Sequence, residues 1–331
     1  MRVLLVGAGR IGSRHADHIS EIGDVVGVCD IDVDKGLKLS KKFNAPFFDS
    51  LENMLSQNIE ADLVAVCTPN GLHAAQSIAA LNAGFNVLCE KPMAISVSDC
   101  RKMIQVADSQ NKKLFVVKQN RFNPPVAAIK NLIESGDLGR IFSVQLSCLW
   151  NRNEAYYSDS WRGTKKLDGG ILYTQFSHFI DLIVWLFGEV DVIKSVVENV
   201  SKRNDIEFED SCNVLCKLPN GAQATMNFSI NAFEQNMEGS ITIVAEKGTV
   251  KVGGQYLNVL EYQNLKEGKL TDLPEGRPAN NYGHYTGSMS NHGLVYRNVL
   301  NALNNTKSSL ASGLDGLRTV ELIEDIYKSA L

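Results

Sequence analysis

A lysine and a histidine that could move a proton stand at two distant points of the sequence. Lys91 follows the apolar run 86–89 and Glu90 in LCEKPM, and His178 lies in TQFSHFIDL. Hydride transfer from a secondary alcohol needs a base for the hydroxyl proton and donors that hold the oxygen as charge develops. Burial beside a cationic group favours a neutral, basic lysine, whereas histidine needs little adjustment. We therefore predict that Lys91 or His178 is the base. The alternatives are a solvated lysine at a strand end and a buried structural histidine.

The histidine belongs to a polar stripe in an otherwise apolar segment. After the glycine pair of LDGG, Thr174, His178 and Asp181 occupy positions i, i+4 and i+7, which share one face of a helix. The segment 170–187 is therefore predicted to be a helix with one polar face. Thr174 joins Lys91 and His178 as a candidate catalytic residue.

Glycines near the start of the sequence predict a dinucleotide site. The opening VLLVGAGRIGSRH has the spacing G-x-G-x-x-G between a strand pattern and a helix pattern. The first glycine allows a tight turn, the second lets pyrophosphate approach the backbone, and the third lets the helix pack on the strand. Asp30 ends the second strand, where a carboxylate binds ribose hydroxyls and repels a 2′-phosphate. We predict NAD rather than NADP, bound in this loop by Gly7, Gly9, Arg10, Ile11 and Gly12.

A parallel sheet is needed to bring these residues together. Short apolar runs alternate with helical patterns over residues 1–121, which predicts strands joined by crossover helices. Ligands bind beyond the carboxyl ends of such strands. The polar residues that we expect at this edge, near the cofactor, are Thr68, Asn70, His73, Glu90, Lys91 and Gln119.

The periodicity changes after residue 140. Residues 212–218 and 222–230 alternate between apolar and polar, the pattern of an antiparallel sheet with one buried face. We expect an α/β protein with an NAD-binding Rossmann domain over 1–121 and a substrate-binding and oligomerisation α+β domain over 122–331, whose final helices are able to pack back on the first domain. Because an exposed sheet face needs a cover, we also expect a homo-oligomer, either a dimer or a tetramer.

The composition argues against several classes of partner. A formal charge of −4 over 331 residues, with no long block of Lys and Arg, argues against nucleic acid. There is no apolar run long enough to span a membrane and no signal peptide, so we expect a soluble, cytoplasmic protein with no membrane partner. The 7 cysteines show no CxxC pair, which indicates core positions in a reduced compartment and no metal site.

Several motifs resemble those of a known family. GAGRIGSRH, VCTPNGLHA, CEKPM and GG followed by SHFIDL are similar to the glucose-fructose oxidoreductase and inositol dehydrogenase (Gfo/Idh/MocA) family over nearly the whole chain. The resemblance implies a Rossmann domain, an open and mostly antiparallel sheet used in oligomerisation, and Lys91 and His178 as catalytic residues. Many members have an aspartate four residues before the histidine, where this chain has Thr174. Proton transfer and the binding of the substrate oxygen would then be shared between Lys91 and His178.

A narrower resemblance concerns the substrate. VVKQNRFNPP, the run from LWNR to LDGG, TQFSHFIDL and EGSITIVAEKGTVKVGG are similar to bacterial enzymes that oxidise C3 of UDP-N-acetylglucosaminuronate for the O-antigen sugars of lipopolysaccharide. These enzymes also tend to lack the aspartate before the histidine. The resemblance implies that Trp161 and Arg162 approach the nicotinamide. It implies substrate contacts for Lys91, Gln119, Arg121, Asn123, Arg152, Tyr156, Tyr157, Gln175 and His178.

Simpler roles remain open for the aromatic and basic members of this set. Arginine donates two parallel hydrogen bonds to a diphosphate or a uronate, both of which are anionic. Each arginine could instead form an ion pair within the protein. Tyr156 and Tyr157 could stack on uracil or fill the core.

Four functions fit these features. The first is NAD-dependent oxidation of a UDP-N-acetylglucosaminuronate-like sugar nucleotide to the 3-keto sugar. The second is the same chemistry on a free sugar or on a polyol such as inositol. The third is a non-catalytic regulator that senses NAD or sugar, although a sensor would not need the proton acceptors Lys91 and His178. The fourth is glycoside cleavage through a transient 3-keto intermediate.

Overall fold

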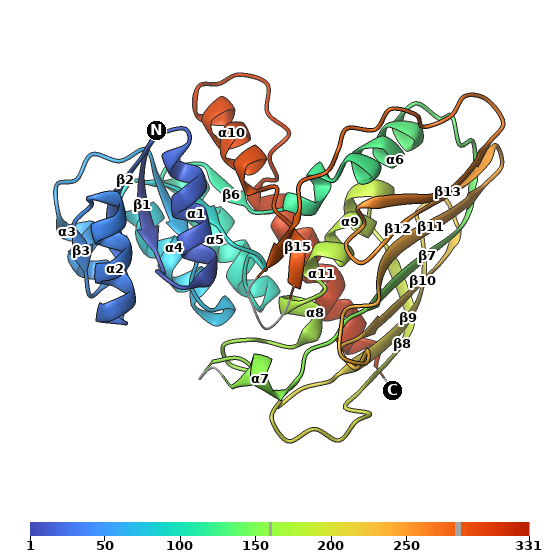
Figure 1. Cartoon of the computed structure of the whole chain (residues 1–331), viewed down its shortest axis with the longest axis horizontal. Coiled ribbons are helices and arrows are strands. Elements are labelled where there is room, and N and C mark those ends of the chain that lie inside the picture. Colours follow the sequence, from blue (N-terminus) through green and yellow to red (C-terminus); the bar gives the residue numbers. More distant parts are fainter. Residues whose placement is uncertain (159–160, 282–285, 331) are drawn as a thin grey trace. The chain divides into compact units, whose positions relative to one another are not determined.

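The chain divides into two units, each with its own sheet (Figure 1). The computed structural model describes residues 1–158, 161–281 and 286–330. The first unit comprises Met1–Lys118 and His292–Val320, and the second comprises Gln119–Asn291 and Glu321–Leu331. The boundary expected after residue 121 lies close to this division, whereas His292–Val320 belongs to the first unit and not to the second half of the sequence.

A six-stranded parallel sheet forms the centre of the first unit. Its strands are apolar and buried on both faces, as in sheets covered by helices on both sides. In spatial order they are β3 (Phe47–Phe48), β2 (Asp24–Cys29), β1 (Arg2–Val6), β4 (Leu63–Val66), β5 (Asn86–Cys89) and β6 (Leu114–Val116). The predicted Rossmann sheet is thus confirmed.

Helices follow most of these strands, and three of them begin with a side-chain cap. Asp32, Ser50 and Ser96 accept the backbone N–H three residues further on, which satisfies one free donor of the first helical turn. The helices are α1 (Arg10–Ser20), α2 (Val33–Phe43), α3 (Leu51–Ser56), α4 (His73–Asn82) and α5 (Val97–Ser109), with a 3-10 turn η1 at Asn70–Leu72.

Residues 292–320 complete the first unit. Helices α10 (His292–Leu303) and α11 (Gly313–Lys328) follow the second sheet in sequence, and the segment between them lies along β6, where the Val116 N–H donates to the Ala311 carbonyl at 3.1 Å. A Cβ at Gly316 would lie 2.7 Å from Met93 Sδ. Helix α11 therefore packs too closely on this edge for a larger residue at that position.

The second unit contains a seven-stranded sheet in which only the β7·β10 pair is parallel. In spatial order its strands are β13 (Val259–Leu265), β12 (Gly248–Gly253), β11 (Glu238–Ala245), β7 (Ile141–Leu149), β10 (Gln223–Ser229), β9 (Ser211–Lys217) and β8 (Asp191–Glu198). A separate pair consists of β14 (Ala279–Asn281) and β15 (Thr286–Met289). The predicted α/β class with a mostly antiparallel second sheet is confirmed.

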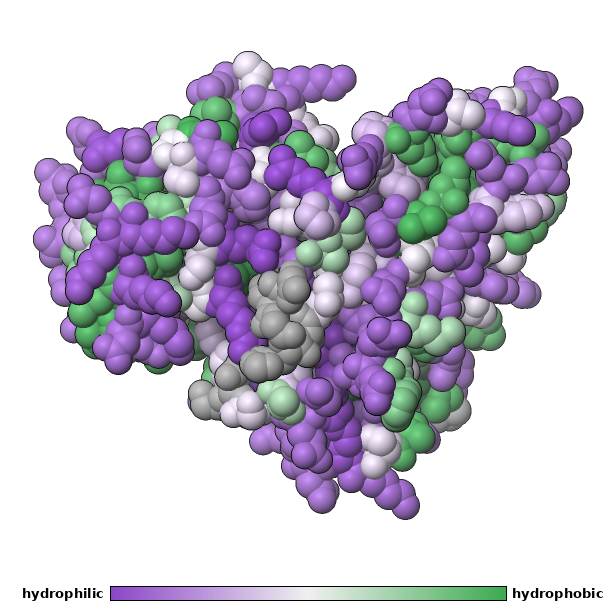
Figure 2. All heavy atoms as spheres, viewed as in Figure 1, coloured by the Kyte–Doolittle hydropathy of each residue, from purple (hydrophilic) through white to green (hydrophobic). Residues whose placement is uncertain are grey.

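The two faces of the seven-stranded sheet differ in burial. On the inner face Phe228 stacks on Phe176 with centroids 5.0 Å apart, and Trp150 packs against Phe179 of α9 (Ser177–Phe187) at 5.3 Å. The outer face presents apolar residues among polar ones, and hydrophobic and hydrophilic side chains are interspersed over this unit in Figure 2. The partly exposed apolar residues on its strands include Phe142, Ile193, Val196, Leu215, Val244, Val259 and Tyr262.

The helix predicted over 170–187 is divided in two. Helix α8 covers Ile171–Thr174 and α9 covers Ser177–Phe187. The backbone N–H groups of Gln175 and Phe176 both donate to the Ile171 carbonyl, which ends α8, and Phe176 has ψ −2° as the N-cap of α9. Thr174 and His178 therefore lie on two short helices, and the predicted single polar face is wrong in this respect. The remaining helices of the unit are α6 (Pro124–Glu134), α7 (Glu154–Tyr157) and the 3-10 turn η2 (Gln119–Phe122).

The cysteines have the core positions expected from the sequence. All of Cys29, Cys67, Cys89, Cys100, Cys148, Cys212 and Cys216 are free and buried. Burial raises the pKa of the Cys29 and Cys212 thiols to about 12, so these groups stay protonated at neutral pH. Among the residues that the structure describes, no helix has the length and apolar character needed to cross a membrane.

Candidate cofactor and active site

The glycines of the first loop have three different environments. Gly7 has φ +97°, and a Cβ there would lie 2.7 Å from the Cys67 carbonyl oxygen. A Cβ at Gly12 would lie 1.8 Å from the Gly7 carbonyl oxygen. Gly9 has no atom within 4 Å of its Cβ position. Gly7 and Gly12 are thus required by the fold, whereas the open space at Gly9 fits the close approach of a pyrophosphate to the start of α1.

Asp30 links this loop to the end of β2. Its carboxylate accepts the N–H of Ala8 at 2.5 Å and that of Asp32 at 2.8 Å. A carboxylate has about four lone-pair positions, so two protein donors leave capacity for the ribose hydroxyls. The position agrees with the predicted role in NAD binding.

The loop after β4 carries Thr68, Asn70 and His73. His73 is buried, with Nδ1 2.7 Å from the Pro92 carbonyl oxygen and Nε2 2.8 Å from the Thr68 carbonyl oxygen. Burial lowers the pKa of its imidazole despite these two acceptors. Both ring nitrogens thus face the main chain. We therefore expect His73 to influence the cofactor indirectly, by holding the main chain at Thr68 and at Pro92. Pro92 follows the cis Lys91–Pro92 peptide bond.

Glu90 lies in a buried network just before Lys91. Its Oε1 is 2.7 Å from His15 Nε2 and 3.3 Å from His292 Nε2, and its Oε2 accepts the Lys91 N–H at 2.9 Å. Burial alone would raise the pKa of the Glu90 carboxyl, but the hydrogen bond from His15 and the nearby imidazole of His292 hold it well below its usual range. The carboxylate is therefore ionised. His15 was visible in the motif GAGRIGSRH but received no role from the sequence.

The same three residues have the composition of a metal site. The ligand atoms of His15, Glu90 and His292 all lie within 4.8 Å of one another. Zinc bound to nitrogen and oxygen at about 2.0–2.1 Å holds two tetrahedral ligands roughly 3.3 Å apart. The 2.7 Å between His15 Nε2 and Glu90 Oε1 is a hydrogen-bond distance. His15 and Glu90 are therefore spaced for a hydrogen bond to each other and not for binding one metal ion together.

The second unit joins four of the predicted residues in two side-chain pairs. Gln119 Nε2 lies 3.3 Å from His178 Nε2, and Gln175 Nε2 donates to the Tyr156 hydroxyl at 3.2 Å. All four side chains are buried. The side-chain oxygens of Gln119 and Gln175 have no hydrogen-bond partner in the described structure. Because buried polar atoms are usually paired, these two oxygens fit a polar ligand.

Thr174 is held by a carboxylate to which the sequence assigned no role. Its hydroxyl donates to the Asp168 carboxylate, which also accepts the Gly163 N–H at 2.8 Å. Asp168 has 0% exposure. It therefore fixes both Thr174 and the loop that follows Trp161 and Arg162. The sequence feature that could have indicated Asp168 is its position directly before the glycine pair in LDGG, which precedes an apolar segment.

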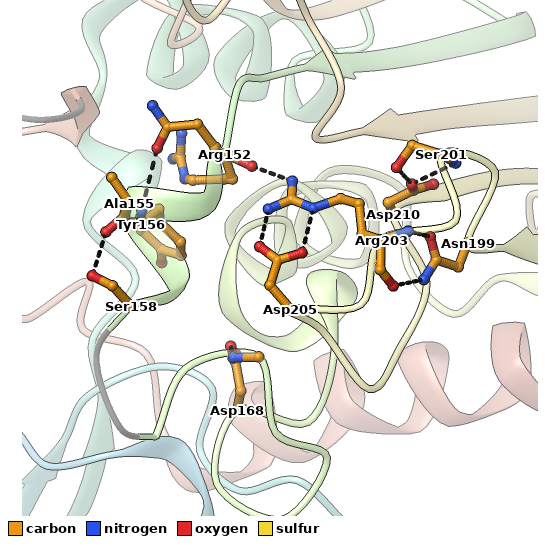
Figure 3. Close-up of polar contacts among 12 residues, drawn as sticks. Arg152, Ala155, Tyr156, Ser158, Asp168, Asn199, Ser201, Arg203, Asp205 and Asp210 are labelled. Carbon is orange, nitrogen blue, oxygen red and sulfur yellow. Dashed lines mark hydrogen bonds and ion pairs between the residues drawn. The ribbon is translucent and has the colours of Figure 1, made fainter.

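Arginine side chains lie over the two predicted tyrosines. The guanidinium carbon of Arg162 is 4.6 Å from the Tyr156 ring centroid and that of Arg152 is 5.1 Å from it, which are cation–π distances. Figure 3 shows Arg203, which the sequence did not indicate, donating to the Arg152 carbonyl and pairing with Asp205. Tyr156 and Tyr157 are both buried, which is compatible with core filling, and stacking of either ring on uracil stays a prediction.

Two other candidates are already occupied by protein partners. Arg121 donates from Nε and Nη2 to the two carboxylate oxygens of Asp181, both at 2.8 Å. Asn123 donates to the Tyr256 carbonyl at 2.9 Å and accepts from Asn291 at 2.7 Å. The ion-pair alternative is therefore observed for Arg121. Direct contact of either residue with a substrate stays a prediction.

Comparisons with known proteins agree with this geometry. Residues 1–118 match the family model described as an oxidoreductase family with an NAD-binding Rossmann fold, and residues 126–251 match the GFO/IDH/MocA C-terminal domain. The structure is similar to that of the WlbA dehydrogenase from Chromobacterium violaceum in complex with NADH and UDP-GlcNAcA. That similarity has a TM-score of 0.90 and 36% identity, and covers 100% of this chain and 93% of that one.

Two further relatives are similar to this chain, one in structure and one in sequence. The WlbA dehydrogenase from Bordetella pertussis, also in complex with NADH and UDP-GlcNAcA, has a TM-score of 0.89 and 35% identity over 100% of this chain and 96% of that one. Inositol 2-dehydrogenase from Acidothermus cellulolyticus is 26% identical over 77% of this chain and 73% of its own length. From its glycine loop, its two sheets and these matches, we conclude that the chain is an NAD-binding oxidoreductase of the GFO/IDH/MocA family.

Proposed function

We propose that this protein oxidises the C3 hydroxyl of a UDP-N-acetylglucosaminuronate-like sugar nucleotide to the 3-keto sugar. The observation that carries the proposal is the similarity over the whole chain to two dehydrogenases solved with NADH and UDP-GlcNAcA. The buried oxygens of Gln119 and Gln175 support a ligand rich in hydroxyl groups. NAD, when bound, supplies the hydride acceptor.

The contacts of His178 favour Lys91 as the proton acceptor. Gln119 Nε2 and His178 Nε2 lie 3.3 Å apart, so this ring nitrogen already faces a polar group of the protein. Lys91 would take the hydroxyl proton, while His178 and Thr174 would orient the substrate. Trp161 and Arg162 remain the candidates for contact with the nicotinamide.

A second candidate function is oxidation of a free polyol. Inositol 2-dehydrogenase is among the relatives in sequence, at 26% identity, and the guanidinium of Arg121, one of the predicted contacts to an anionic substrate, is paired with Asp181. A polyol needs hydroxyl and amide partners and no cation. The two candidates therefore differ in whether binding depends on the charge of the substrate.

We further propose a cytoplasmic enzyme of bacterial surface-polysaccharide synthesis that works as a homo-oligomer. Seven buried free thiols suit a reducing compartment. The outer face of the seven-stranded sheet exposes apolar side chains such as Leu215 and Val244. A second copy of the chain would remove this surface from water.

The test is a single-turnover reaction at enzyme concentrations close to those of NAD. UDP-N-acetylglucosaminuronate, UDP-N-acetylglucosamine and myo-inositol are offered in turn, and the near-ultraviolet absorbance of reduced nicotinamide is followed. We expect a rise with the uronate, lost in Lys91→Ala and retained in Lys38→Ala on the exposed side of α2. A rise with myo-inositol alone would favour the polyol function, and no rise with any of the three would contradict both.

A further inference from the structure

Four buried polar side chains meet in the first unit next to Lys91. His15 comes from α1, Glu90 from the end of β5, and His292 and Tyr296 from α10. Their exposures are 0%, 4%, 1% and 0%. Burial of so many polar groups is costly unless each is hydrogen-bonded. Their arrangement therefore needs an explanation beyond packing.

One proton of this network can be placed from chemistry. A carboxylate only accepts hydrogen bonds, so His15 Nε2, at 2.7 Å from Glu90 Oε1, carries a hydrogen. The Tyr296 hydroxyl lies 2.7 Å from His15 Nδ1, within hydrogen-bond distance. Tyr296, His15 and Glu90 thus form a continuous hydrogen-bonded chain.

The second histidine supports the same carboxylate from another side. His292 Nε2 lies 3.3 Å from Glu90 Oε1, and burial lowers the pKa of His292 to about 4, so its ring is neutral at physiological pH. His292 also packs edge-on against His15 with ring centroids 5.1 Å apart, and stacks on His18 at 6.2 Å. Glu90 therefore keeps its charge beside His15 and His292, and its other oxygen accepts the backbone N–H of Lys91 at 2.9 Å.

We propose that His15, His292 and Tyr296 are positioning residues that act through Glu90 on Lys91 and link it to the cofactor helix α1. Helix α1 begins at the glycine loop, and His15 lies on the same helix. Movement of α1 is thereby transmitted to the residue that precedes Lys91. The proposal rests on the proposed function only in taking Lys91 as the proton acceptor.

If these four side chains only filled space in the core, apolar residues would serve the same purpose. Apolar residues of similar volume would fill this space at less cost than an ionised carboxylate, since replacing buried charged groups by well-packed apolar ones is often neutral or stabilising. The hydrogen-bonded chain from Tyr296 through His15 instead fixes the orientation of the Glu90 carboxylate. That orientation sets the position of the Lys91 backbone.

The kinetic test uses variants that remove hydrogen bonds but keep shape. Tyr296→Phe deletes one hydroxyl and His15→Phe keeps an aromatic ring. We expect kcat to fall roughly 3–10-fold and 10–100-fold respectively, with the Kd for NAD changed less than about 2-fold. Tyr327→Phe, which loses a buried hydroxyl bonded to Glu209 in the second unit, is the control and should keep its kcat. Loss of stability in the two network variants with unchanged kcat would overturn the proposal.

A second readout needs no substrate. In nitrogen-15 NMR of the wild type, His15 should carry a hydrogen on Nε2, and hydrogen exchange at the Lys91 amide should be slow. His15→Phe should speed that exchange at least 10-fold, and an unchanged rate would overturn the proposal even if the kcat falls. If the wild type forms no NADH with any of the three substrates, the proposed function fails while this readout still decides the role of the network.

The remaining alternative is that His15, Glu90 and His292 bind a metal ion. Purified protein loaded with Zn²⁺ and then dialysed should retain none by elemental analysis, and chelator should leave the His15 signals unchanged. One zinc retained per chain, with the His15 Nε2 hydrogen absent from the spectrum, would show a metal site in place of the hydrogen-bond network and overturn the proposal.

Discussion

Arg121→Ala would seem the natural test for an anionic substrate, but the structure predicts that it mainly destabilises the protein. The Arg121 and Asp181 side chains are 8% and 2% exposed and share two hydrogen bonds of 2.8 Å. The guanidinium also lies 5.2 Å from the Trp185 ring centroid. Removing Arg121 leaves the carboxylate of Asp181 buried without this partner. A raised KM in this variant would therefore not show contact with substrate.

The size of the effect follows from the burial. Breaking a buried ion pair by deleting one partner costs about 3–5 kcal/mol, because the other charge stays desolvated. For a unit of this size 1 kcal/mol lowers Tm by about 2–4 °C, so the loss should reach roughly 6–20 °C. The two charges should couple in a double-mutant cycle, with Arg121→Met combined with Asp181→Leu less destabilised than the sum of the single variants.

Asp181→Asn is the matched control because it breaks the same pair but retains the guanidinium. Chemical denaturation gives the free energy of unfolding of each variant, and steady-state kinetics gives KM for the UDP-uronate. If Arg121 is structural, both variants lose stability and KM changes similarly in both. If Arg121→Ala loses less than about 1 kcal/mol and alone raises KM, the reasoning from burial is refuted and direct substrate contact is supported.

Three further predictions concern other parts of the chain. Gly9→Ala should fold and bind NAD at least 10-fold more weakly by fluorescence titration, whereas Gly7→Ala should lose stability, because its Cβ would lie 2.7 Å from a carbonyl oxygen at φ +97°. Burial raises the pKa of Glu209 from 4.5 to about 7, so the folded state holds a proton that the unfolded chain has released. Stability should then fall as the pH rises from about 4.5 to 7, by up to about 3 kcal/mol in urea titrations, and Glu209→Gln should remove this slope. Leu215→Lys, on the outer sheet face where Leu215 is 40% exposed, should reduce the molecular mass measured by light scattering; an unchanged mass would exclude that face as the interface.

The parts of the fold that depend on local patterns could be predicted from the sequence. The strands of the first sheet are short apolar runs, and the alternation in 212–218 and 222–230 specifies one buried face. The sequence allowed the final helices to pack back on the first domain but could not specify which residues do so; the structure places His292–Val320 in the first unit. Amphipathic helices show which face is buried but not against which element. Only long-range contacts, such as Gly316 against Met93, decide this.

The candidate site shows the same limit at the level of single residues. Lys91 and His178 were identified because each interrupts an apolar pattern, and the glycine spacing located the cofactor loop. The partners that orient them come from distant positions: His15 is 75 residues from Glu90 and 281 from Tyr296 in sequence. A buried histidine has no periodic signature, so its hydrogen-bond partners cannot be inferred from spacing. Sequence can therefore nominate the groups that transfer a proton, whereas the groups that hold them in place become visible only in the folded structure.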